Sequence, residues 1–157
     1  MFASASTALE RGRHLCPSRS QALFDNLLGL LSVPSPSSLL WPNVCEALDA
    51  WPAEDLVPLL PAIDAALLAR PKAFPITRYK RQARLPAPVQ DRSLPSNWLA
   101  RIAAGEPLPQ ARLARSLTVR DHGCVERWTL AEWSRLVQSP DLDSIVWLTL
   151  GENLKDA

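Results

Sequence analysis

The sequence is poor in the residue types that carry most catalytic and metal-binding chemistry. Its 157 residues include only two histidines, three cysteines and five glycines. It contains no G-x-S-x-G motif, no glycine-rich phosphate loop and no Cys-x-x-Cys pair. It also lacks a run of about 18 apolar residues, so no membrane span is expected. These absences favour a non-enzymatic protein without a cofactor; an enzyme with an unrecognised site remains an alternative.

The sequence also has no excess of charge of one sign, because its formal net charge is only +1. Overall charge therefore implies no nucleic-acid partner. Arginine outnumbers lysine 14 to 3, a bias typical of GC-rich, bacterial-like genomes. The opening stretch, MFASASTALERGRHLC, lacks the apolar core of a secretory signal peptide. We therefore expect a cytoplasmic protein whose cysteines are reduced.

Proline is abundant, with 15 residues, and it divides the chain into four expected regions. Residues 1–17 show little periodicity and are expected to form a flexible arm. Residues 18–69 contain apolar stripes and predict helical hairpins. Residues 70–95 are rich in proline and arginine and predict an extended connector. Residues 96–157 predict a short helix followed by a β-α-β unit.

The short helix is expected to carry Trp98, Leu99 and Ile102 on one face. Gly105 lies past its expected end and predicts where the helix stops.

Several local signals predict where individual helices begin and end. Ser18 and Gln21 have the spacing of a capping box. Pro42 suits the first position of a second helix that runs to Leu48. Pro58 and Pro61 lie within a helical pattern, so we expect a kink or a restart near Pro61.

In the last third of the chain, one apolar spacing occurs twice, 31 residues apart. The two copies are Ala114, Leu117, Val119 and His122, followed by Ile145, Leu148, Leu150 and Asn153. Between them, Thr129 and Glu132 predict a capped helix that Ser139 and Pro140 end. A strand, a helix and a strand at this separation predict parallel pairing through a crossover.

This region resembles the leucine-rich repeat family in its ribonuclease-inhibitor-like, helix-containing form, whose pattern is L-x-x-L-x-L-x-x-N. The second copy matches the pattern well, whereas the first has Ala114 for Leu and His122 for Asn. The resemblance implies an α+β, mostly α fold in which Leu130, Trp133 and Leu136 cover the strands. It further implies a scaffold for protein–protein interaction, such as the N-terminal cap of a longer repeat protein.

A protein partner would then bind the β face. The residues expected to line that face are Ser116, Thr118, Arg120, Trp147, Thr149 and Glu152. An open edge at the last strand predicts either self-association or a partner that covers it.

Basic residues are concentrated in the connector, between positions 70 and 84, without an acid among them. The group considered for anion or nucleic-acid binding is Arg78, Tyr79, Lys80, Arg81 and Arg84. Because the rest of the chain balances this charge, we favour a structural connector and expect no nucleic-acid partner.

The remaining candidates favour structural roles. His14-x-Cys16 and His122-x-Cys124 do not have the usual spacings of zinc ligands, so no metal is expected. Cys45 lies on an apolar helical face and predicts a buried, inert thiol. The acidic pairs Glu54-Asp55 and Asp141/Asp143, near helix or strand starts, are expected to be solvated charges or partners of a helix dipole rather than acid–base pairs. Five of the six tryptophans are expected to pack in the core, leaving Trp147 for the binding face.

Overall fold

Helices account for most of the regular structure of this chain. The computed structural model describes residues 4–32, 39–70, 90, 92–118, 128–145 and 147–149. Within these ranges the fold is mostly α, as the composition and periodicity predict. The chain divides into an N-terminal unit, residues 1–91, and a C-terminal unit, residues 92–157. None of the helices in the described ranges has the length and apolar character needed to cross a membrane.

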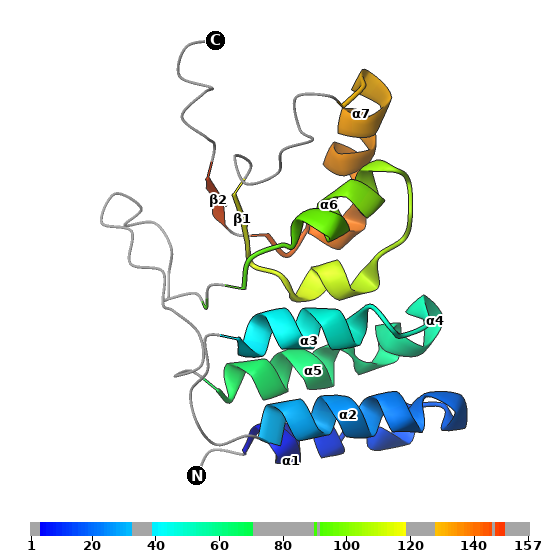
Figure 1. Ribbon diagram of the computed structural model, residues 1–157, viewed down its shortest axis with the longest axis vertical. Coiled ribbons are helices and arrows are strands. Elements are labelled where there is room, and N and C mark those ends of the chain that lie inside the picture. Colours follow the sequence, from blue (N-terminus) through cyan, green and yellow to red (C-terminus); the bar gives the residue numbers. More distant parts are fainter. Residues whose placement is uncertain are drawn as a thin grey trace. The chain divides into compact units, whose positions relative to one another are not determined.

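Among the described residues, the N-terminal unit is built mainly from α1 (Ala5–Glu10), α2 (Gln21–Ser32), α3 (Leu40–Leu48) and α5 (Leu60–Leu68), with the four-residue helix α4 (Ala53–Leu56) between the last two. Helix α1 packs against α5 and α2, and α2 packs against α3 (Figure 1). Their apolar stripes meet in a core in which many side chains are fully excluded from solvent. These include Leu9, Phe24, Leu27, Val44, Leu48, Ile63 and Leu67.

The N-terminal segment is part of this core, so the prediction of a flexible arm is wrong for residues 4–17. Ser4 caps α1 by accepting a 3.2 Å hydrogen bond from the Thr7 backbone N–H. Ala5 and Leu9, one helical turn apart, are both buried. A helix of six residues is too short to show convincing periodicity, and its order comes from packing against α5.

Proline determines the boundaries between α3 and α5. Helix α4 (Ala53–Leu56) leads into a 3₁₀ turn, Val57–Leu59, and α5 restarts at Leu60 with Pro61 in its second position. The predicted restart near Pro61 is therefore confirmed. Its physical reason is that a proline in the first turn of a helix removes no helical hydrogen bond. Helix α3 begins two residues before Pro42, earlier than predicted.

The predicted capping box at Ser18 is not formed. Ser18 instead belongs to a 3₁₀ turn, Ser18–Ser20, that precedes α2. The Gln21 side chain donates to the Cys16 carbonyl at 3.0 Å and accepts from Arg13. Ser18 and Gln21 thus have the residue types and spacing of a capping box but do not form its hydrogen bonds.

In the C-terminal unit, α6 (Ser96–Ala103) buries Trp98, Leu99 and Ile102, the three residues expected on its inner face. Gly105 follows its end with φ +92°, a conformation that glycine adopts without steric cost. The N–H of Gly105 donates to the Ile102 carbonyl, and the N–H of Glu106 donates to the Arg101 carbonyl. These two bonds form a Schellman motif that ends the helix.

Two short strands, β1 (Ser116–Thr118) and β2 (Trp147–Thr149), pair in parallel with Leu117 opposite Leu148. Ser93 forms an isolated parallel bridge to Ser116. Helix α7 (Leu130–Gln138) lies between the strands in sequence but packs beside α6 (Figure 1). Because Leu136 is the only buried side chain of α7, a helix covering the strands through Leu130, Trp133 and Leu136 is not observed. The expected leucine-rich-repeat-like β-α-β unit is therefore not supported.

Candidate interaction surface

Residues at both ends of helix α7 define where it begins and ends. The Thr129 hydroxyl accepts a 3.2 Å hydrogen bond from the Glu132 N–H, and the Glu132 carboxylate accepts a 3.1 Å bond from the Thr129 N–H. This reciprocal pair is a capping box, as the sequence predicts. Ser139 and Pro140 end the helix and begin a 3₁₀ turn, Pro140–Leu142. The capping pair thus satisfies backbone donors at a helix end that lies in solvent.

One side of α7 attaches the helix to α6. Leu136 is buried, and Arg135 Nη1 donates a 3.1 Å hydrogen bond to the Ala103 carbonyl near the end of α6. The Arg135 side chain also passes Gly105, where an added Cβ would lie 3.6 Å from Arg135 Cδ. These contacts leave the other side of α7 facing solvent.

The exposed side of α7 is apolar. Leu130, Trp133 and Val137, which we call the α7 stripe, are 87%, 39% and 83% exposed. They recur at steps of three and four and, at about 100° per residue, project within about 60° of one another. The core packing expected for Trp133 is not observed. Trp128 contacts Trp133 edge-to-face, with ring centroids 5.2 Å apart, which restricts the orientation of the Trp133 ring.

A buried carboxylate supports the part of the unit that follows α7. Asp141 accepts hydrogen bonds from the Leu108 backbone N–H at 2.9 Å and from Arg112 Nε at 2.8 Å. The Ser144 hydroxyl, three residues later, donates to the Ala114 carbonyl at 3.0 Å. These bonds attach the Pro140–Leu142 turn to the 3₁₀ helix Pro109–Leu113. The sequence interpretation of Asp141 as a solvated charge is therefore wrong.

The strand residues expected to bind a partner are only partly described. Ser116 is buried, with 8% of the residue exposed, so it does not offer a surface for a partner. Thr118, Trp147 and Thr149 lie in the paired strands as expected. Arg120 and Glu152 fall outside the described residues, as do Arg78, Tyr79, Lys80, Arg81 and Arg84 of the basic cluster.

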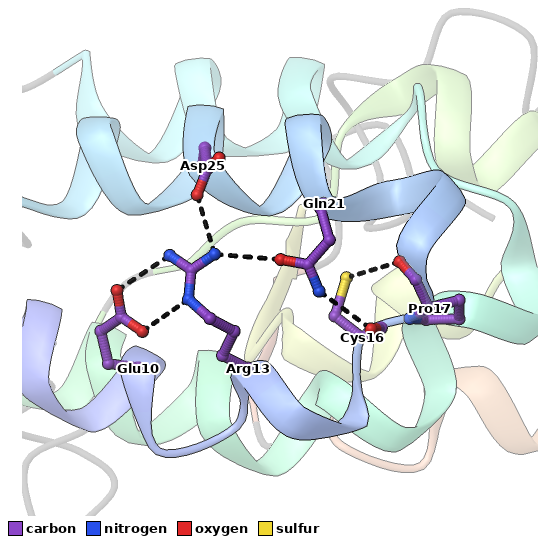
Figure 2. A network of polar contacts seen from close by, with 6 residues as sticks. All are labelled: Glu10, Arg13, Cys16, Pro17, Gln21 and Asp25. Carbon is purple, nitrogen blue, oxygen red and sulfur yellow. Dashed lines mark hydrogen bonds and ion pairs between the residues drawn. The ribbon is translucent and has the colours of Figure 1, made fainter.

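The N-terminal unit contains a polar network around Arg13 (Figure 2). The Arg13 guanidinium donates to both carboxylate oxygens of Glu10, at 2.7 and 2.8 Å, and forms a 2.9 Å ion pair with Asp25. It also lies 4.6 Å from the centre of the Phe24 ring, a cation–π contact. Hydrogen bonding to Arg13 lowers the pKa of Glu10. The network links the end of α1 to α2 and is structural in character.

An ion pair between Arg19 and Asp55 links the 3₁₀ turn before α2 to α4. The nearly buried Asp55 carboxylate accepts from Arg19 Nε at 2.8 Å and Nη2 at 2.7 Å, and from the Ser20 hydroxyl at 2.6 Å. The hydrogen bonds from Arg19, followed by that from Ser20, lower the pKa of Asp55. Its oxygens are thus occupied within the fold, and the expectation that this acid is solvated is wrong.

The described thiols and histidine do not form a reactive or metal-binding group. Burial raises the pKa of both the Cys16 and Cys45 thiols, which disfavours the nucleophilic thiolate. His14 is exposed, whereas Cys16 is buried and donates to the Pro17 carbonyl. Among the described residues, no three His, Cys, Asp or Glu side chains gather as a metal site would require; His122 and Cys124 lie outside them.

The α7 stripe is the functional candidate that sequence reasoning missed. The sequence shows its apolar residues at helical spacing, but that spacing predicts a buried helix face as well as an exposed one. Comparison with known proteins adds no assignment, because no family model, no curated protein and no solved structure matches this chain.

Proposed function

We propose that this protein is a non-enzymatic protein-interaction module that binds a partner through the α7 stripe. The observation that carries the proposal is the exposure of Leu130, Trp133 and Val137 on one side of a helix whose ends are firmly defined. A single exposed leucine is ordinary on a protein surface, whereas three aligned apolar residues indicate a contact surface. Tryptophan is also enriched among the residues that dominate binding energy.

The non-enzymatic part of the proposal is supported by how the buried acids are used. Asp55 and Asp141 are both buried, yet each is occupied by an arginine and a second donor. Both carboxylates are held by hydrogen bonds that link segments of the fold. The pKa values of the Cys16 and Cys45 thiols are raised rather than lowered, which is opposite to what a cysteine nucleophile needs.

Membership of the leucine-rich repeat family is a secondary part of the proposal. The parallel register of Leu117 with Leu148 supports it, because that register aligns the two copies of the repeated spacing. The exposure of Leu130 opposes it, because a repeat helix would bury that position against the strands. Partner binding is accordingly proposed for α7, with Trp147 and Thr149 of β2 as secondary contacts.

Exchange of the stripe for polar residues tests the proposed function. Partners captured from a lysate would be identified, purified and titrated against the wild-type chain and a Leu130→Asn/Val137→Asn variant. Because both side chains are exposed, the variant should fold normally and bind at least about tenfold more weakly, a loss of about 1.4 kcal/mol. Leu68→Asn, which alters an exposed leucine of the N-terminal unit, should leave binding unchanged. Equal affinity of the stripe variant would overturn the proposal.

The concentration of Arg78, Lys80, Arg81 and Arg84 in the sequence makes anion binding the second candidate. Arg70 Nη1 donates to the Leu31 carbonyl, near the end of α2, and Gln90 Nε2 donates to the Leu67 carbonyl, near the end of α5, both at 2.9 Å. Residues on either side of the basic segment are thus attached to helix ends of one unit. Replacement of Arg78, Lys80, Arg81 and Arg84 by Gln should not affect protein binding. Salt-dependent oligonucleotide binding that this variant loses would favour the second candidate.

A further inference from the structure

We draw no further inference here: the strongest candidate, the exposed apolar stripe on α7, belongs to the site already described, and nothing in the structure shows what covers it.

Discussion

Asp141 accepts a 2.8 Å hydrogen bond from Arg112 Nε although the two residues lie 29 positions apart in the sequence. The same carboxylate accepts from the Leu108 N–H, so its loss would leave a buried backbone donor without its partner. Asp141→Ala should lower the free energy of unfolding by about 2–4 kcal/mol. Urea unfolding measures the change. The control, Asp143→Ala at an exposed carboxylate, should stay within about 0.5 kcal/mol of the wild type; equal effects would contradict a role for the Asp141 contacts.

Gly12 allows α1 to approach α5 closely. A Cβ at this position would lie 2.7 Å from Ala62 Cβ, shorter than a van der Waals contact permits. Gly12→Ala should therefore destabilise the protein by about 1–3 kcal/mol, measured as a lower unfolding midpoint.

Gly29 provides the matched control for Gly12. It lies within α2, and nothing lies within 4 Å of its added Cβ. Because alanine favours helix more than glycine, Gly29→Ala should raise stability by about 0.5–1 kcal/mol. Stabilisation by both substitutions would show that α1 and α5 are less closely packed than the structure indicates.

The Asp55 ion pair predicts a specific dependence of stability on pH. Hydrogen bonds from Arg19 lower the pKa of the folded-state carboxyl below the unfolded value of about 3.9. A lowered folded-state pKa adds stability above the unfolded pKa, and that stability is lost as pH falls through the folded-state pKa. Asp55→Asn should therefore reduce stability at pH 6 and flatten the loss of stability below about pH 4. Urea unfolding of both proteins between pH 6 and about pH 4 measures the change. If the Asp55 contacts contribute nothing, Asp55→Asn and the wild type would lose stability equally as pH falls.

The capping box of α7 predicts local rather than global instability. Thr129→Ala removes the hydroxyl that accepts from the Glu132 N–H, at a cost of about 1 kcal/mol to the helix. Amide hydrogen exchange should accelerate over residues 130–133 and remain unchanged in α2 and α5. Thr129→Ser keeps the acceptor and should exchange like the wild type. Uniform acceleration throughout the chain would instead indicate that α7 unfolds only with the whole protein.

Burial of the thiols predicts slow chemical modification. Cys16 and Cys45 are both buried, and desolvation raises their pKa values. In a Cys124→Ser variant, a disulfide reagent should react slowly with the native protein and rapidly with two thiols after unfolding in urea. Rapid reaction of the native variant would contradict the described burial.

Signals within a few residues of one another were sufficient to predict several elements. Thr129, Glu132 and the Ser139-Pro140 pair predicted the bounds of α7, and Gly105 predicted the end of α6. Pro61 likewise predicted the restart of α5. These features depend on hydrogen bonds and steric limits within one helical turn, which neighbouring residues determine. The burial of Cys45 also followed from its position on an apolar helical face.

The sequence by itself determined that Leu130, Trp133 and Val137 share one side of a helix, because helical geometry places residues three and four apart together. Only the tertiary structure decided that this side faces solvent while Leu136 faces α6. The same applies to Asp55 and Asp141, whose arginine partners are 36 and 29 positions away. Periodicity identifies an apolar face, but burial depends on which distant segment packs against it, and that information lies in the assembled fold.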